Sequence, residues 1–258
     1  MVRDIREPAP RHPTRRVEGN ASTRRRIGAA SPWPGADSQG RRRFVAGTLA
    51  ALAAGLLPRG PAHAAAGYPA TVAAMQVAHE RETRVYYRYG EFGRKAKQDG
   101  YFGIAYLFTA FAASELIHAT NFGKILARLD VELAPVAKGP SKVGSTRENL
   151  IAAANDEMES IDSFYPKLLE KLKPEGYEDA MLSVRYAWSS EQQHRDKIKQ
   201  IQRWSDTFFE TVAKRIDEKT GVYYVCQICG ATVNAIPAGE CAVCRNPATH
   251  YRKIEPPA

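Results

Sequence analysis

Apolar residues recur at every third or fourth position along four long stretches of the chain. The stretches are residues 69–98, 101–129, 146–173 and 177–217. This spacing places the apolar side chains on one face of an α-helix, so each stretch is predicted to be an amphipathic helix. The sequences KQDGY (97–101) and KPEGY (173–177) interrupt the pattern after the first and the third helix. The pattern therefore predicts two pairs of helices.

Residues 130–145 form the long connection between the two pairs. About 16 residues can extend over roughly 53 Å, whereas a helix of about 28 residues is roughly 42 Å long. The segment can therefore cross the full length of a bundle, as a four-helix bundle with a long crossover requires. We expect a mainly α-helical fold.

Each of the four apolar faces contains a carboxylate at a position that should point into the core, and two faces add a histidine three residues later. The six residues are Glu82 in the first helix, Glu115 and His118 in the second, Glu157 in the third, and Glu191 and His194 in the fourth. In both halves a Gly-Tyr pair follows the first glutamate, and the next glutamate lies 14 residues after the tyrosine. Unrelated surface carboxylates would not explain this matched spacing.

Burying these carboxylates requires compensating positive charge, because an unpaired ionised carboxylate is costly in a protein core. Two divalent cations would neutralise four carboxylates. One glutamate from each of two helices, with Glu-x-x-His from each of the other two, is the ligand set of ferritin-like di-iron or di-manganese sites. We therefore predict a ferritin-like four-helix bundle over residues 69–218 that binds two Fe or two Mn ions.

The four cysteines form two C-x-x-C motifs near the C-terminus, Cys226 with Cys229 and Cys241 with Cys244. Their spacing predicts one tetrahedral four-cysteine metal site in a small domain of short strands and turns, residues 221–256. Two disulfides are the alternative in an exported protein. Iron and zinc both accept four thiolates, so the sequence leaves this metal open.

The formal net charge of +9 is concentrated in residues 1–64, which hold 12 arginines and 4 acidic residues. The rest of the chain is nearly neutral, so we expect no nucleic-acid partner. Arginines at 41–43, an apolar run that ends at Leu57 and a small-residue motif at 62–64 are typical of a twin-arginine export signal. The run is too short to span a bilayer. We predict a disordered leader, no stable membrane insertion and a periplasmic protein, or a cytoplasmic one if the signal is not used.

A helical bundle with these ligands followed by a four-cysteine knuckle resembles the rubrerythrin family over residues 69–255. The stretches RYGEFGRKAKQDGY, ASELIHA, NLIAAANDE and EGYEDA are close to that family's sequence. The resemblance implies that the six bundle residues hold a di-iron site and that the four cysteines hold a rubredoxin-like iron.

The resemblance also implies an oxidoreductase. The family is known for reducing hydrogen peroxide to water, with electrons that an external donor delivers through the rubredoxin-like iron; the sequence does not identify the donor. Its members usually form a head-to-tail homodimer in which the knuckle of one chain serves the di-iron site of the other. Two alternatives remain: an oxidase that converts Fe(II) to Fe(III) for detoxification, and a non-catalytic metal-binding protein with a structural zinc ribbon.

Three further residues lie near the expected metal ligands. The family pattern has an additional glutamate ligand three residues after the third-helix glutamate, and this chain has Ser160 there. Tyr89 and Tyr165 lie near the level of the ligands on their helices. We expect both tyrosines to pack in the core, with hydrogen bonds to the ligands as the alternative.

Overall fold

The computed structural model describes residues 65, 67–202, 209–211, 213–216 and 221–257, which belong to one compact unit of the chain. The predicted leader, residues 1–64, lies outside the described residues. The helical elements are α2 (Pro69–Gln98), α3 (Phe102–Arg128), α4 (Thr146–Glu159), the π-helical turn η1 (Ser160–Phe164), α5 (Tyr165–Leu172) and α6 (Glu178–Gln202).

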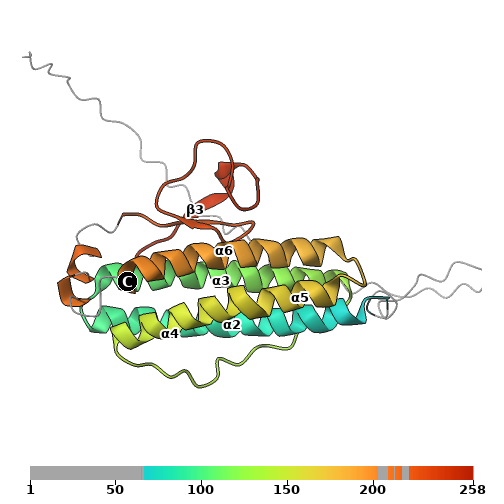
Figure 1. The fold of residues 1–258 in the computed structure, drawn as a ribbon, viewed down its shortest axis with the longest axis horizontal. Helices are drawn as coiled ribbons and strands as arrows, with labels where there is room; N and C mark the ends of the chain where they lie inside the picture. The colour runs from blue at the N-terminus through green and yellow to red at the C-terminus, as the bar shows by residue number, and fades with distance from the viewer. Residues whose placement is uncertain (1–64, 66, 203–208, 212, 217–220, 258) are drawn as a thin grey trace, which may run out of the picture. The chain divides into compact units, whose positions relative to one another are not determined.

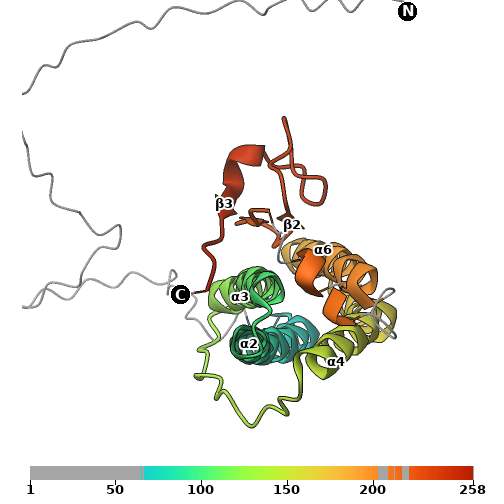
Figure 2. The same cartoon turned by 90° about the vertical axis from the view of Figure 1, so that its left-hand side faces the viewer.

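The helices form the predicted four-helix bundle, seen along its length in Figure 1 and end-on in Figure 2. The third position in the bundle is filled by α4, η1 and α5 together. The crossover between α3 and α4 runs along the side of the bundle (Figure 1), as its length allows. The prediction of a mainly helical bundle is therefore confirmed.

Two apolar clusters fill the bundle core on either side of the polar positions. One cluster contains Phe92, Phe108 and Phe111, and the other contains Met75 and Phe122. On α3 the two polar ligand candidates fall between Phe111 and Phe122, so they lie between the clusters. Burying each of these large side chains contributes about 1.5–3 kcal/mol, and the two clusters hold the helices in place around the polar layer.

The predicted third helix is interrupted by the π-turn η1, which the sequence pattern did not indicate. The N–H of Tyr165 donates to the carbonyl of Ser160, five residues earlier. Pro166 follows directly; it has no N–H, and its ring would clash with the carbonyl of Asp162 in a regular helix. The wider turn removes this conflict, and Tyr165 is fully buried.

The structure describes several separate parts of the predicted fourth helix, residues 177–217. Helix α6 covers Glu178–Gln202, and helical residues are described again at 209–211 and 213–216. Phe209 packs edge-on against Tyr101 with ring centroids 5.3 Å apart. Phe209 thus contacts the turn between α2 and α3.

The C-terminal residues form a small three-stranded antiparallel sheet in the order β2-β1-β3. The strands are β1 (Tyr224–Cys226), β2 (Thr232–Val233) and β3 (Tyr251–Lys253), with a short helical turn η2 (Ala248–His250) before β3. The sheet lies over α3 and α6 (Figure 2), where the Asn121 side chain donates a 2.8 Å hydrogen bond to the carbonyl of Ile228. The cysteine-bearing domain is therefore docked on the bundle of its own chain.

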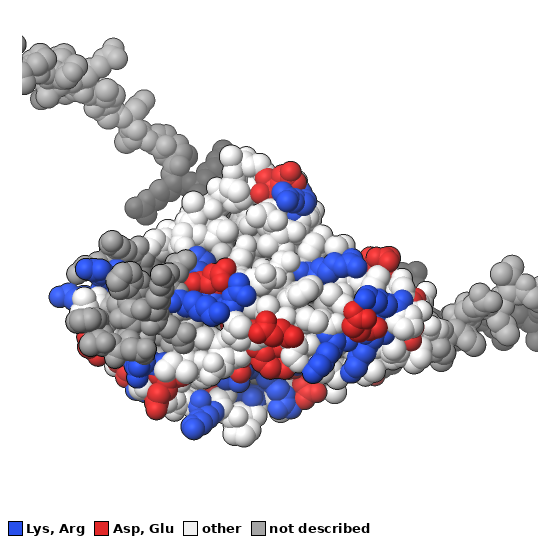
Figure 3. Space-filling model, in the orientation of Figure 1, with Lys and Arg blue, Asp and Glu red and all other residues white. Residues whose placement is uncertain are grey.

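Charged residues of both signs are interspersed over the bundle surface, and the visible face of the sheet domain carries few of them (Figure 3). Helix α3 is long and apolar enough to cross a membrane by length and composition, with a mean hydropathy of 1.3 over its most apolar window. However, 72% of that window is buried inside the molecule. The apolarity of α3 is accounted for by its place in the bundle core.

Helix α4 begins with a capping box that links the crossover to the bundle. The Ser145 side chain accepts from the N–H of Glu148, and the Glu148 carboxylate accepts from the N–H of Ser145 at 2.8 Å. We predict that Ser145→Ala lowers the free energy of unfolding by about 0.5–2 kcal/mol, measured by chemical denaturation followed by circular dichroism. Ser145→Asp keeps a capping acceptor and should stay near wild type; equal losses in both variants would contradict the role of the cap.

Candidate metal centres

The structure brings the six predicted bundle residues together in one buried layer. Each of them is at most 2% exposed. They form two groups whose potential ligand atoms lie within 4.8 Å of one another. One group is Glu82, Glu115, His118 and Glu191, and the other is Glu115, Glu157, Glu191 and His194. The groups share two glutamates, so these two residues would be available to both of two adjacent cations.

The two histidines face the shared glutamates symmetrically. His118 Nδ1 lies 2.9 Å from Glu115 Oε2 and 3.2 Å from Glu191 Oε1. His194 Nδ1 lies 3.1 Å from Glu115 Oε1 and 3.2 Å from Glu191 Oε2. Each ring therefore directs Nδ1 into the layer and keeps Nε2 for a contact outside it.

The electrostatics of this layer favour added positive charge. Burial raises the pKa of the Glu82 carboxyl well above its usual value, and the nearby Glu191 and Glu115 carboxylates raise it further. Burial likewise raises the pKa of Glu157, with Glu191 adding to the effect. Burial alone would lower the pKa of His118, but its hydrogen bonds to Glu115 and Glu191 raise it to about 10. Two divalent cations would supply the positive charge without protonating the carboxylates.

The surroundings of one carboxylate oxygen also favour a bound cation. Glu115 Oε1 is buried; His194 Nδ1 lies 3.1 Å away, but not in hydrogen-bonding geometry, and no other described residue donates to this oxygen. A buried acceptor without a donor is costly, and coordination of a metal ion would satisfy it. The residues present therefore fit a di-metal site of Fe or Mn, for which oxygen and imidazole ligands are suited.

Two buried tyrosines hydrogen-bond the terminal carboxylates, so the expectation that they serve only core packing was incomplete. The Tyr89 hydroxyl donates to Glu157 Oε1 at 2.5 Å, and the Tyr165 hydroxyl donates to Glu82 Oε1 at 2.8 Å. Burial raises the pKa of both phenols well above the usual value. Each tyrosine therefore remains a protonated donor that fixes the orientation of one carboxylate.

Ser160 does not provide a carboxylate, and a guanidinium lies beside it instead. Its side chain is 6% exposed and accepts a 2.9 Å hydrogen bond from Arg81 Nη2. The same nitrogen pairs with Glu159. Arg81 directly precedes Glu82 and could not be identified from periodicity, because its position lies at the edge of the apolar face.

The four cysteines form a second buried cluster. All four are free thiols in the structure, so the alternative of two disulfides is not observed. Cys226 Sγ lies 3.8 Å from Cys244 Sγ, and Cys229 Sγ lies 3.6 Å from Cys241 Sγ. Four thiolates at about 2.3 Å from one ion lie about 3.8 Å apart at the corners of a tetrahedron. The cluster therefore fits one tetrahedral metal ion.

The outer nitrogens of both histidines contact the cysteine domain. His118 Nε2 lies 3.2 Å from the carbonyl oxygen of Cys229, and His194 Nε2 lies 3.3 Å from Thr232 Oγ1. Ser114 Oγ donates a 2.7 Å hydrogen bond to the carbonyl of Gly230. A single backbone carbonyl therefore separates a cysteine of one cluster from a histidine of the other.

Gly230 makes this close approach possible. Its φ is +82°, and a Cβ atom there would lie 2.4 Å from His118 Nε2 and 2.7 Å from Ser114 Oγ. Only glycine fits both the backbone conformation and the space. The sequence analysis did not identify this residue; the glycine directly after a C-x-x-C motif was the available signal, but its contact depends on how the domain docks.

The chain is similar to known proteins both in sequence and in structure. The family model described as Rubrerythrin matches residues 74–202. Rubrerythrin-1 of Clostridium acetobutylicum is 28% identical over 175 residues, covering 66% of this chain and 87% of that protein. Nigerythrin of Nitratidesulfovibrio vulgaris is 28% identical over 178 residues, covering 69% and 83%. A solved structure of fully reduced, all-ferrous nigerythrin aligns with a TM-score of 0.60 and 26% identity, covering 71% of this chain and 86% of that chain.

The sharing of two glutamates predicts unequal effects of two substitutions. Glu115→Ala removes a residue from both groups and should prevent binding of both bundle metals. Glu82→Ala leaves the group around His194 complete and should lose one metal. Metal content per chain after loading with Fe(II) measures both effects, and the four-cysteine site should stay filled. Glu159→Gln changes a half-exposed carboxylate beside the site and serves as the control; two bundle metals in Glu115→Ala would refute the assignment.

Proposed function

The chain belongs to the rubrerythrin family, and we propose that it is a peroxidase that reduces hydrogen peroxide to water. In this proposal the six bundle residues hold two iron ions and the four cysteines hold a third. Electrons from an external donor enter at the four-cysteine iron and pass to the bundle site. Nigerythrin has been solved in mixed-valence and all-ferrous states, which supports redox-active iron at the corresponding centres of this chain.

The contact between the two centres carries the proposal. The Cys229 carbonyl lies 3.2 Å from Nε2 of His118, and Nδ1 of the same ring faces the shared carboxylates. A thiolate ligand and an imidazole ligand are thus joined through one peptide carbonyl and one hydrogen bond. A structural zinc ribbon has no need of such a contact, whereas an electron-transfer centre does.

Bound at the bundle site, a pair of ferrous ions would supply two electrons to the O–O bond of hydrogen peroxide, which with two protons yields two molecules of water. The chain's own residues hold this site dry and oriented. Tyr89 and Tyr165 donate to the terminal carboxylates and keep their protons. The apolar clusters above and below the layer restrict water, as efficient metal-ion catalysis requires.

Electron transfer is proposed to run within one chain. The four-cysteine domain contacts the bundle of its own chain through Ser114, His118 and Asn121. The head-to-tail homodimer implied by the resemblance remains a prediction, and within such a dimer the same contact could form between chains. The two arrangements differ in a way that a complementation experiment detects.

Metal identity separates this function from its alternatives. Three iron ions per chain support the peroxidase, whereas zinc at the cysteines would remove the internal electron path. The oxidase that converts Fe(II) to Fe(III) would use the same bundle site without needing the four-cysteine iron. Metal analysis with a visible spectrum of the four-cysteine site distinguishes the zinc-ribbon protein from the two iron enzymes. Donor-dependent peroxide reduction then separates the peroxidase from the oxidase.

We also propose export to the periplasm through the twin-arginine pathway. The supporting residues, 41–64, lie outside the described part of the chain, so the proposal rests on their sequence alone. This pathway carries folded proteins, which suits a protein that must bind its metals before export.

The peroxidase proposal predicts that Cys229→Ser abolishes donor-dependent peroxide reduction while the bundle metals are retained. The donor would have no entry point, although a chemically pre-reduced bundle site should still consume peroxide once. Steady-state and single-turnover peroxide consumption measure the two properties. An unchanged steady-state rate in Cys229→Ser would refute the electron path.

Complementation tests whether the path lies within one chain. Cys229→Ser and Glu115→Ala chains carrying different tags are co-expressed, and any mixed dimers are isolated. A path within each chain predicts no steady-state activity, because neither chain has both centres. Recovery of activity in the mixed dimer would assign the path to a contact between chains.

Gly230→Ala should slow electron transfer without removing metal. The new Cβ would meet His118 and Ser114 across the docking contact. A destabilisation of about 1.4 kcal/mol would lower the equilibrium constant for docking about tenfold. Stopped-flow oxidation of the reduced four-cysteine iron by peroxide measures the rate. Gly239→Ala, in the same domain with no atom near its Cβ, is the control, and equal rates in both variants would contradict the role of Gly230.

Export should depend on the arginine cluster. We predict that replacing Arg41, Arg42 and Arg43 together by lysine retains precursor in the cytoplasm, because the pathway distinguishes arginine from lysine. Fractionation followed by immunoblotting measures the distribution. Undiminished periplasmic protein in the triple variant would rule out this route.

A further inference from the structure

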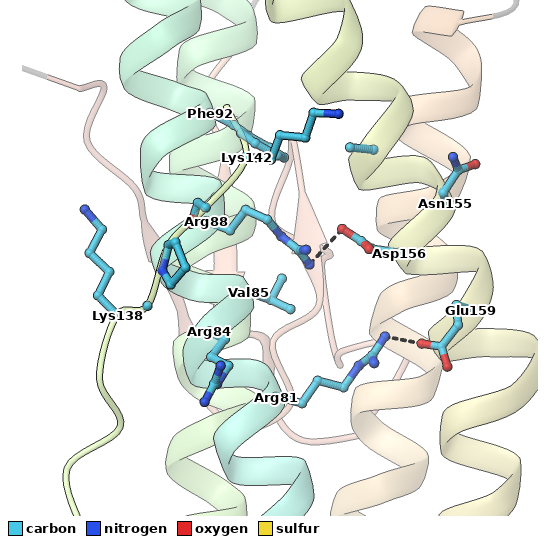
Figure 4. Close-up of a pocket in the computed structure, with 14 residues that line it drawn as sticks. Arg81, Arg84, Val85, Arg88, Phe92, Lys138, Lys142, Asn155, Asp156 and Glu159 are labelled. Carbon is cyan, nitrogen blue, oxygen red and sulfur yellow. Dashed lines mark hydrogen bonds and ion pairs between the residues drawn. The ribbon is translucent and has the colours of Figure 1, made fainter. Parts of the chain in front are cut away.

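A recess of about 620 Å³ lies between α2 and α4, beneath the crossover residues 138–142 (Figure 4). Five cationic side chains line it: Arg81, Arg84, Arg88, Lys138 and Lys142. Only two carboxylates join them there, Asp156 and Glu159. The lining therefore carries a clear excess of positive charge, in a part of the chain whose surface is otherwise evenly mixed.

Most of these cations already have one acidic partner. Arg88 Nη2 lies 2.7 Å from Asp156 Oδ2, and Arg81 pairs with Glu159. Arg84 and Lys138 pair with Glu80 and Glu91, which do not line the recess. Lys142 has no ion pair with any described carboxylate. It interacts with Glu148 at longer range, and Glu148 does not line the recess. The lining itself therefore keeps five cations against two carboxylates.

The arginines keep hydrogen-bond donors that their ion pairs do not use. A guanidinium has five N–H donors, so the ion pairs that Arg81 and Arg88 make with Glu159 and Asp156 leave other donors for a ligand. Figure 4 shows both guanidiniums directed into the space between α2 and α4, with Lys142 extending over it from the crossover. Donors from two segments of the chain therefore converge on one volume.

We propose that this recess binds a phosphate-type oxyanion, either free or as the phosphate group of a small organic molecule. Guanidinium groups match the geometry of phosphate oxygens and form charge-assisted hydrogen bonds with them. The volume lies within the range of small-molecule sites and exceeds what inorganic phosphate alone would fill. Val85 and Ala152 supply apolar surface in the same recess for the rest of an organic phosphate.

The recess is separate from the di-metal layer. Its lining includes none of the six predicted metal ligands. Arg81 and Asp156 directly precede Glu82 and Glu157 in the sequence, so their side chains leave the same helices in other directions. Peroxide reduction does not require this site, and the proposal stands independently of that function.

Calorimetric titration of full-length, metal-loaded protein with inorganic phosphate and with glycerol 3-phosphate, at constant ionic strength, tests the proposal. Lys142→Gln should weaken binding about tenfold, because it removes one charge-assisted hydrogen bond. Arg88→Gln should have a similar effect. Arg128→Gln is the matched control: Arg128 lies outside the recess and has a similar ion pair, at 2.6 Å from Asp179.

Saturable binding that Lys142→Gln weakens and Arg128→Gln does not would support the site. Tighter binding of glycerol 3-phosphate than of inorganic phosphate would identify an organic phosphate as the ligand, and the reverse order would identify the free ion. Absence of saturable binding by both probes would overturn the proposal. So would binding that only Glu115→Ala abolishes, since the anion would then be a ligand of the bundle metals.

Discussion

Four carboxylates share one layer of a helical core, and the rest of the structure is arranged around that constraint. Burial raises the pKa of Glu82 and Glu157, so the layer is unfavourable unless positive charge enters it. The two histidines and the two shared glutamates concentrate the ligand atoms, and the phenols of Tyr89 and Tyr165 orient the terminal carboxylates. The apolar clusters on both sides provide the stability that allows this polar layer to exist.

The four-cysteine site and the bundle site are joined by a contact that requires glycine at position 230. The cysteine domain brings its backbone to the outer edge of the histidine rings, where a carbonyl meets His118 and Thr232 meets His194. These contacts hold the rings by Nε2 while Nδ1 faces the carboxylates, so docking of the small domain also orients ligands of the bundle. The two domains thus form one unit in which the position of each centre constrains the other.

Periodicity and the matched spacing of the two halves together predicted the six bundle residues, because a ligand must lie on the buried face of its helix and the spacing of the apolar positions identifies that face. The same reasoning could not decide whether Tyr89 and Tyr165 pack or hydrogen-bond, since both roles require a core position. The π-turn at Ser160–Phe164 depends on Pro166 and on packing against other helices, which local pattern does not record. Gly230 and the basic recess were missed because each arises from segments distant in sequence that meet only in the fold.

Charge balance links these features to the chemistry of the site. Four carboxylates offset two divalent cations, whereas loss of one electron from each cation leaves two positive charges without partners. A glutamate at position 160 would offset one of them, but Ser160 is neutral and accepts a hydrogen bond from Arg81. The Arg81 guanidinium, only partly neutralised by half-exposed Glu159, adds positive charge beside Glu82. Both features disfavour the oxidised pair relative to the reduced pair. In the proposed peroxidase the reduced pair is the form that must be present when peroxide arrives, and a serine at position 160 would help to keep the pair in that form.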